Sequence, residues 1–160
     1  MNDFVTDEFN FQDYVNNLYP DDKIGFLASA EFVKMQQIYR GSNYVYLTLL
    51  QNSLDEQLLA VYKPVDGLMQ LFDFDIYTLP NRELAAYEID QFLKWSIVPS
   101  VVVRDGPMGI GSLQEFVNHD PSKNYFHFAE NEINKDQLIK IAIFDLLINN
   151  ADRKGGHIIK

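Results

Sequence analysis

Three short runs that are largely apolar constrain the fold of this chain more than any other feature of its sequence, and the second of them is rich in aromatic and branched residues. They span residues 32–39, 44–50 and 58–63, and polar turns separate them. Runs of this length and composition are typical of β-strands, and short turns join antiparallel neighbours. Pro64 ends the third run because proline has no N–H group to donate to a sheet. The sequence therefore predicts a three-stranded antiparallel sheet.

Two further segments extend and cover this sheet. Residues 79–96 change to a helical period, which predicts an amphipathic helix. Residues 101–103 and 112–117 flank a turn sequence at 105–107, which predicts a second hairpin and a sheet of about five strands. The apolar face of the helix would carry Ala85, Ala86, Ile89, Phe92 and Leu93, and its polar face Glu83, Tyr87, Asp90 and Lys94.

The last long element is a second helix that ends in a polar loop. Asn134 opens a capping-box pattern, and residues 138–148 are apolar except for Lys140 and Asp145. This composition predicts a helix that is buried on most sides and that leads into the loop of residues 149–157. An order of strands, helix, strands and helix favours an α+β fold over alternating β–α–β units.

Composition narrows the possible functions. The chain has 160 residues, and 13 basic against 23 acidic residues give a net charge of −10, which argues against binding to nucleic acid or anionic membranes. The lack of cysteine excludes disulfide scaffolds, thiolate metal sites and cysteine nucleophiles. No apolar run approaches the length of about 18 residues that a transmembrane segment needs, so we expect neither membrane spanning nor export, and a cytoplasmic location.

The acidic residues are concentrated at the N-terminus. Residues 1–31 carry seven acidic residues and only Lys23, a net charge of 1 − 7 = −6. This predicts a solvated lead-in that is partly disordered or forms a short helix over residues 9–18, with a partner-binding arm as the alternative. The sheet and its helix would then occupy residues 32–118, and the last helix and loop residues 119–160.

Four pieces of the sequence stand in an order that carries a resemblance. They are Lys63 after the third strand, Arg82-Glu83 in the first long helix, residues 111–117 (GSLQEFV) and residues 150–157 (NADRKGGH). Together they resemble an uncharacterised bacterial family related to phosphatidylinositol 3/4-kinases and, more distantly, the HipA-type protein kinases. The resemblance implies a kinase-like fold, with residues 32–118 as the N-lobe and 119–160 as the start of a helical C-lobe.

The resemblance also implies a role for each piece in binding ATP and transferring its phosphoryl group. Lys63 would neutralise phosphate charge, and Glu83 would hold Lys63 through an ion pair. Asp152 would orient the acceptor hydroxyl and accept its proton. Ser42 and Asn43 lie where kinase-like folds place a phosphate-covering turn. The interlobe connection, whose backbone would bind the adenine edge, would consist of Gln114, Glu115, Phe116 and Val117.

Each of these assignments has a purely structural alternative. A lysine at a strand end, such as Lys63, usually lies in solvent. Glu83 near a helix N-terminus is favoured by the helix dipole whatever its function. Asp152 would be an ordinary turn residue before two glycines, and the neighbouring Arg153 could either order the loop or meet phosphate.

The expected metal site departs from the family pattern. The resemblance implies ATP with Mg²⁺ or Mn²⁺, yet His157 stands five positions after Asp152, where phosphatidylinositol kinases carry a metal-binding asparagine. Magnesium prefers oxygen ligands, so His157 would bind a different metal, contact the ion through water or donate a hydrogen bond to phosphate. The second acidic ligand, which follows the catalytic loop in such kinases, is not found before Lys160.

Two interpretations follow from that departure. The chain is either an incomplete copy of a longer protein or a kinase-like remnant, and in both cases we expect the 160 residues alone to be inactive. The leading function is an ATP-dependent phosphotransferase with an unknown phosphoryl acceptor. The alternatives are a pseudokinase-type module that binds a nucleotide or a protein without catalysis, and an unrelated α+β interaction domain.

Overall fold

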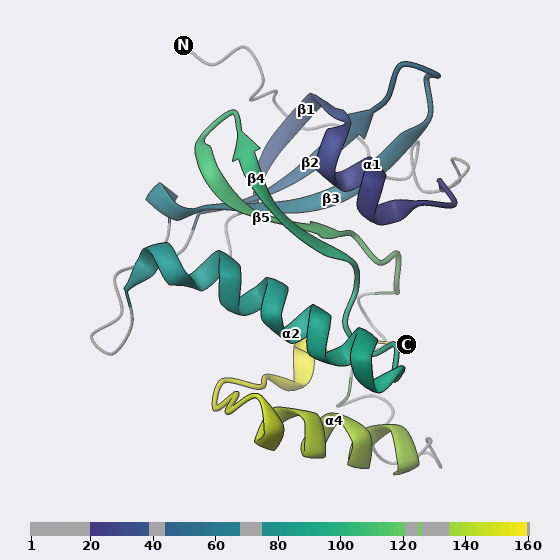
Figure 1. Cartoon of the computed structure of the whole chain (residues 1–160), viewed down its shortest axis with the longest axis vertical. Coiled ribbons are helices and arrows are strands. Elements are labelled where there is room, and N and C mark those ends of the chain that lie inside the picture. Colours follow the sequence, from purple (N-terminus) through teal and green to yellow (C-terminus); the bar gives the residue numbers. More distant parts are fainter. Residues whose placement is uncertain (1–19, 39–43, 68–74, 121–124, 126–134, 160) are drawn as a thin grey trace. The chain divides into compact units, whose positions relative to one another are not determined.

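The computed structural model describes residues 20–38, 44–67, 75–120, 125 and 135–159 (Figure 1). The chain divides into two compact units, Met1–Phe116 and Val117–Lys160. Within the described ranges the first unit contains five strands and two α-helices, and the second contains one α-helix of more than one turn. The fold is therefore α+β, as the order of elements in the sequence predicted.

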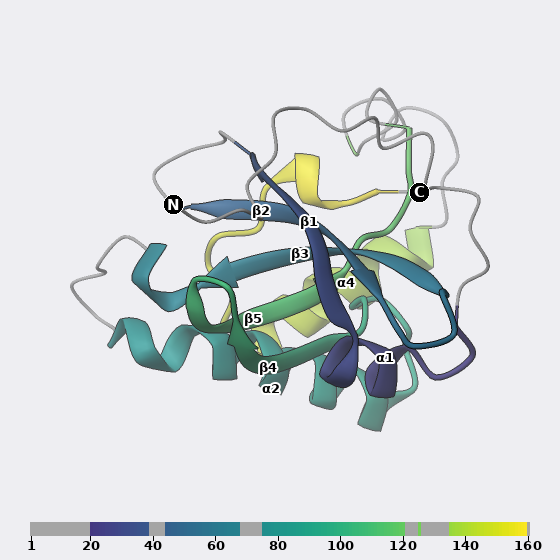
Figure 2. The same cartoon turned by 90° about the horizontal axis from the view of Figure 1, so that it is seen from above.

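The first unit is built on one antiparallel sheet whose strand order is β1–β2–β3–β5–β4 (Figure 2). Both predicted hairpins are confirmed, the first as β1–β2 and the second as β4–β5. The runs of strand-forming residues and the turns between them predicted these strands to within a few residues at each end. The strands are β1 (Glu31–Ile38), β2 (Val45–Gln51), β3 (Gln57–Pro64), β4 (Val101–Gly106) and β5 (Gly109–Glu115).

A helix that the sequence analysis did not anticipate covers one face of this sheet. Helix α1 (Lys23–Ser29) begins at Asp22, whose carboxylate accepts a hydrogen bond from the N–H group of Gly25 at 2.9 Å. Leu27 is fully buried in the core of the first unit. Residues 22–31 are thus part of the folded unit, and the acidic lead-in predicted over residues 1–31 was drawn too long.

That error has a simple cause, because net charge was used where periodicity was needed. The acidic side chains near α1 cap the helix or lie exposed, whereas Phe26, Leu27 and Ala30 between them are buried. The helix predicted over residues 9–18 lies outside the described residues.

The core on the α1 side is centred on Tyr62 of β3. Its fully buried ring packs edge-to-face against Phe32 with centroids 5.3 Å apart, and its hydroxyl donates to the carbonyl oxygen of Gly109. Burial raises the pKa of this hydroxyl to about 12. Arg104 lies over the Phe32 ring and donates to two carbonyl groups at the end of α1, each at 2.9 Å.

Helix α2 (Leu79–Leu93) packs against β4 and β5 on the opposite face. Neighbouring residues of a strand point to opposite faces of a sheet, so Lys63 reaches the α2 side where Tyr62 fills the α1 side. The helix ends at Lys94, which adopts a left-handed conformation with φ of 57°. This face of the sheet holds the first candidate site.

The predicted amphipathic pattern of α2 is wrong at three positions, one of which is Ala85, a residue assigned to the apolar face that is exposed. Phe92, assigned to the apolar face, is 86% exposed, and Asp90, assigned to the polar face, is completely buried. The Asp90 carboxylate accepts hydrogen bonds from the backbone N–H groups of Ile97 and Val98, each at 3.1 Å. Hydrogen bonding to the chain that follows, rather than hydrophobic periodicity, therefore accounts for the burial of Asp90.

Helix α4 (Lys135–Leu147) is the main described element of the second unit, and its burial differs from the prediction. Phe144 is its one buried side chain, and four apolar residues of the helix are 49–83% exposed. The expected burial on most sides is therefore wrong, because apolar content alone does not specify how many faces are covered. The capping residue proposed at position 134 lies outside the described ranges. None of the described helices has both the length and the apolar character that crossing a bilayer requires.

Candidate functional site

The predicted ion pair between Lys63 and Glu83 is present. Lys63 lies one residue before the end of β3, and Glu83 lies in the second turn of α2. The Lys63 ammonium donates to Oε1 of Glu83 at 2.8 Å, and the two side chains are 26% and 36% exposed. The prediction that these two side chains meet is thus confirmed, and the cation remains within reach of solvent.

Ser112 completes this arrangement, and the sequence analysis did not identify its role. It lies directly opposite Lys63 in the β3–β5 ladder, and its Oγ donates to Oε2 of Glu83 at 2.7 Å. Ser112 is 1% exposed, so the carboxylate of Glu83 is fixed from the interior of the unit on one oxygen and by Lys63 on the other. Knowledge of the β3–β5 register would have revealed this partner.

A glycine allows the two strands to approach at this point. A Cβ atom at Gly111 would lie 2.4 Å from the carbonyl oxygen of Lys63, closer than real Cβ contacts come. Gly111 also pairs with Pro64 in the ladder. The lack of a side chain at position 111 therefore helps to fix the backbone that carries Lys63.

The segment predicted to bind the adenine edge is already engaged in the sheet. The N–H group of Glu115 donates to Ser100 O at 2.9 Å, and that of Phe116 donates to Leu59 O at 3.0 Å. Gln114 pairs with Val101 and Val61 in the ladders on its two sides. An adenine at Glu115 or Phe116 would therefore have to bind their backbone carbonyl groups or displace these hydrogen bonds. The predicted recognition of adenine by the backbone is thereby limited at these two residues to hydrogen-bond acceptors.

The same segment carries an ion pair and the boundary between the two units. The carboxylate of Glu115 forms an ion pair with Lys23 of α1, so its side chain has a structural partner. The boundary between the two units falls between Phe116 and Val117, inside the segment predicted to connect two lobes. The remaining residues predicted to contact phosphate, Ser42 and Asn43, lie outside the described residues.

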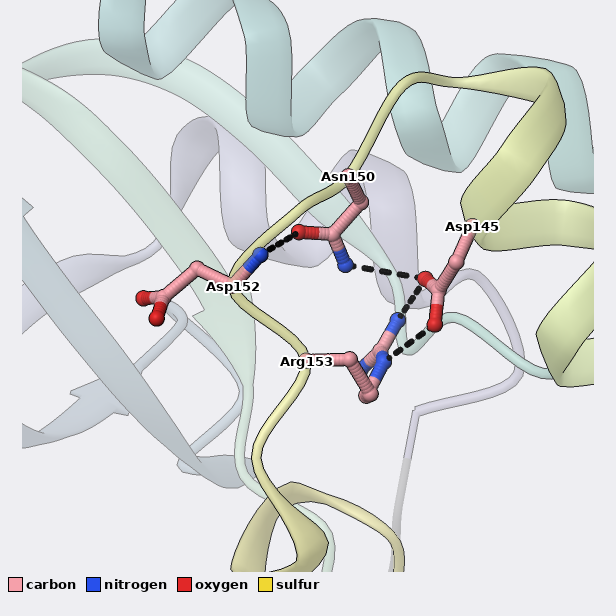
Figure 3. A network of polar contacts seen from close by, with 4 residues as sticks. All are labelled: Asp145, Asn150, Asp152 and Arg153. Carbon is pink, nitrogen blue, oxygen red and sulfur yellow. Dashed lines mark hydrogen bonds and ion pairs between the residues drawn. The ribbon is translucent and has the colours of Figure 1, made fainter.

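In the second unit, Asp152 lies in the polar loop that follows α4 (Figure 3). Its backbone N–H group donates to Oδ1 of Asn150 at 3.2 Å, and its carboxylate is 83% exposed, pointing away from the other three residues drawn. Lys154 approaches Oδ2 of Asp152 to 3.3 Å, in a contact between two exposed groups. The backbone of Asp152 is thus held while its carboxylate faces solvent.

Arg153, for which two roles were open, is used to order the loop. Its Nε donates to Oδ2 of Asp145 at 2.9 Å and its Nη2 to Oδ1 at 2.7 Å. This hydrogen bonding holds the pKa of Asp145 below its usual range and raises that of Arg153. Both groups are therefore charged at physiological pH. The Nε–Nη2 edge of the Arg153 guanidinium, which matches the geometry of a carboxylate, is occupied by Asp145.

The residue predicted to bind metal does not stand in a ligand cluster. His157 is exposed in the short 3₁₀ turn Gly155–His157, and its backbone N–H group donates to Lys154 O at 2.9 Å. Among the described residues no three His, Asp or Glu side chains come together as a metal site needs. The described part of the chain therefore does not fit a resident divalent ion, and metal binding by His157 stays a prediction.

Comparison with known proteins adds one relative. The chain is 36% identical over 172 residues to Protein Rv2133c of Mycobacterium tuberculosis, an alignment that takes in 87% of this chain and 62% of the relative. The chain thus spans less than two thirds of the length of that protein, whose name states no activity. No protein-family model and no solved structure match the chain. The side chains described above are consequently the basis on which a function can be assigned.

Proposed function

We propose that this chain carries the nucleotide-binding and phosphoryl-transfer residues of an ATP-dependent phosphotransferase related to the phosphatidylinositol 3/4-kinases. The observation that carries the proposal is the Lys63–Glu83 ion pair with Ser112 behind it. In phosphoryl transfer the protein contributes mainly position and positive charge, and a strand lysine held by a helix glutamate supplies both.

The state of the pair supports a phosphate-binding role over a structural one. An ammonium has three donors, and the ion pair with Glu83 uses one of them. The partial exposure of Lys63 leaves its other donors accessible to an anion. The hydrogen bond from the buried Ser112 keeps the Glu83 carboxylate in place when Lys63 binds that anion. A pair of this exposure contributes only about 0–1 kcal/mol to stability, so stability alone is a weak reason for it.

Asp152 supplies the second function in the proposal. A carboxylate that is exposed on a backbone held by hydrogen bonds can orient an acceptor hydroxyl and take its proton as the phosphoryl group moves. The proton passes from the acceptor oxygen to the carboxylate, and a new bond forms between that oxygen and the γ-phosphorus of ATP. The bond between this phosphorus and the bridging oxygen breaks, and ADP leaves with the electron pair of that bond. The acceptor in this proposal is a hydroxyl group, and the molecule that carries it is a lipid, a protein or a small molecule.

A pseudokinase-type binding module is the second candidate, and one observation favours it. The described residues lack a cluster of carboxylates for a divalent ion, which catalysis by kinases normally requires. Such a module would bind nucleotide through Lys63 and transfer nothing. Binding and transfer therefore have to be measured separately.

The proposal is tested by calorimetric titration of the chain with ATP in the presence of Mg²⁺, with adenosine as a ligand that lacks phosphate. We expect Lys63→Met to weaken ATP binding about 10- to 100-fold, the loss that follows from one charge-assisted hydrogen bond. Adenosine should bind parent and variant equally. Lys34→Met is the matched control, because it removes a lysine charge from β1 of the same sheet.

The outcomes separate the candidates. Equal ATP affinity of Lys63→Met and parent, or no ATP binding by the parent, contradicts a nucleotide site at Lys63. ATP binding that depends on Lys63, without phosphate transferred to any acceptor or to water, selects the pseudokinase module.

A further inference from the structure

The C-terminus of α4 has a geometry that brings one residue, Asp145, into contact with two residues of the loop that follows. Asn149 adopts a left-handed conformation with φ of 54°. The N–H group of Asn149 donates to Leu146 O at 3.4 Å and that of Asn150 to Asp145 O at 2.8 Å. These two bonds form a Schellman motif, which ends the helix and turns the chain back over its last turn.

The side chain of Asp145 then holds the residues that follow the motif (Figure 3). Its Oδ1 accepts from Nδ2 of Asn150 at 2.8 Å as well as from Arg153, which also donates to Oδ2. The carboxylate is 13% exposed, so these partners replace most of its contact with water. Asp145 therefore receives hydrogen bonds from both sides of Asp152, without contacting the Asp152 side chain.

We infer that Asp145 is a positioning residue that sets the conformation of the loop and thereby the direction of the Asp152 carboxylate. This inference rests on the proposed function, because the direction of Asp152 matters only if that carboxylate meets an acceptor hydroxyl. A backbone fixed at residues 150 and 153 leaves Asp152 few conformations, which is the kind of order that accelerates a reaction between positioned groups.

A similar motif at the end of α2 shows that this use of side chains is not required to end a helix. Asp90 occupies the same position relative to its helix end, since the N–H group of Trp95 donates to Asp90 O at 3.3 Å. Its carboxylate, however, accepts from backbone N–H groups only in the bonds described above. Asp145 instead holds specific side chains, so its contacts fix what the loop presents.

The test compares the parent chain with Asp145→Asn and with Asp136→Asn, a matched control in the exposed first turn of the same helix. Nuclear magnetic resonance relaxation gives the order of the Asp152 amide and of the Arg153 Nε–H group. In Asp145→Asn we expect both order parameters to fall from about 0.85 to below about 0.6. The Asn150 amide should keep its order, because its acceptor is the backbone carbonyl of residue 145.

The catalytic part is measured in a form of the protein that is competent for the reaction, as phosphate released from radiolabelled ATP and Mg²⁺ in single turnovers with the protein in excess. We expect Asp145→Asn to lower the maximal rate about 10- to 100-fold, the effect of a displaced catalytic group, while half-saturating ATP stays unchanged. Arg153→Met should give the same loss, and the double variant no further loss, because both changes remove one contact.

Unchanged order at Asp152 and Arg153 in Asp145→Asn overturns the inference whatever ATP does. A fall in order with an unchanged maximal rate also overturns it, since Asp145 would then serve only the fold. A parent that neither binds ATP nor releases phosphate contradicts the proposed function itself. In that event the order parameters still show separately whether Asp145 holds the loop.

Discussion

The ion pair of the first unit and that of the second unit differ in how fully their charged groups are engaged. Lys63 gives one hydrogen bond to Glu83 and stays partly exposed, and Ser112 holds Glu83 from behind. Asp145, in contrast, accepts two hydrogen bonds from Arg153 and another from Asn150. The first pair leaves a cation with capacity for an anion, and the second pair closes a loop.

This difference indicates where ligand chemistry is to be sought. A group whose hydrogen bonds lie within the fold maintains structure, and one with unused donors or acceptors facing solvent can bind. By this criterion Lys63 and Asp152 are the groups available for chemistry, and Glu83, Ser112, Asp145 and Arg153 position them. The following predictions test that division, starting with the largest expected effect.

Asp152→Asn should lower phosphoryl transfer by roughly two to four orders of magnitude, the contribution of a general base, with ATP affinity unchanged. Asparagine keeps the size of the side chain and loses its basicity. Transfer is measured with radiolabelled ATP in a form of the protein that is competent for the reaction. Equal transfer by variant and parent would show that Asp152 is only a turn residue.

The two pairs should contribute unequally to stability. Asp145→Ala leaves the Arg153 guanidinium and the side-chain amide of Asn150 without their acceptor, so we expect the free energy of unfolding of the second unit to fall by about 2 kcal/mol. Lys63→Met should cost less than about 1 kcal/mol, because exposed pairs contribute little. Urea denaturation, followed at amides of each unit, measures both. Similar losses would remove the distinction between the two pairs.

The same contrast should appear in the dependence on pH. The pKa of Asp145 is lowered in the folded chain, so its stabilising effect is present above the unfolded pKa of about 3.9 and is lost as pH falls through the folded value. The stability difference between parent and Asp145→Asn should therefore be constant from about pH 7 to 5 and shrink below about pH 4. A difference that persists undiminished at the lowest pH would mean that the charge of Asp145 does not hold the loop.

The smallest effect is expected from the partner that supports Glu83. Ser112→Ala removes one hydrogen bond from the carboxylate and should weaken ATP binding about threefold, within the range of a single hydrogen bond. Ser29→Ala is the control, since it removes a serine hydroxyl that donates to the backbone at an exposed position of helix α1. If both variants bind ATP as the parent does, Ser112 does not support the site.

The sequence allowed the five strands and the Lys63–Glu83 pair to be predicted, the strands from local pattern and the pair from resemblance. Burial was harder to predict, because it depends on what packs against each element. The exposure of α4 and the burial of Asp90 are both of this kind. The supporting residues Ser112 and Asp145 were missed for a related reason, since strand register and the geometry of a helix end select their partners.

The proposed function depends above all on contact between the Lys63 ammonium and the phosphates of a bound nucleotide. The most direct test of this contact is the magnetic resonance signal of the Lys63 side chain, assigned by comparison with Lys63→Met, during titration with the non-hydrolysable analogue AMP-PNP and Mg²⁺. We predict that this signal shifts to saturation with the analogue and not with adenosine, while the Lys34 signal stays in place. A Lys63 signal that remains unmoved when AMP-PNP is bound would show that Lys63 does not contact the phosphates of the nucleotide.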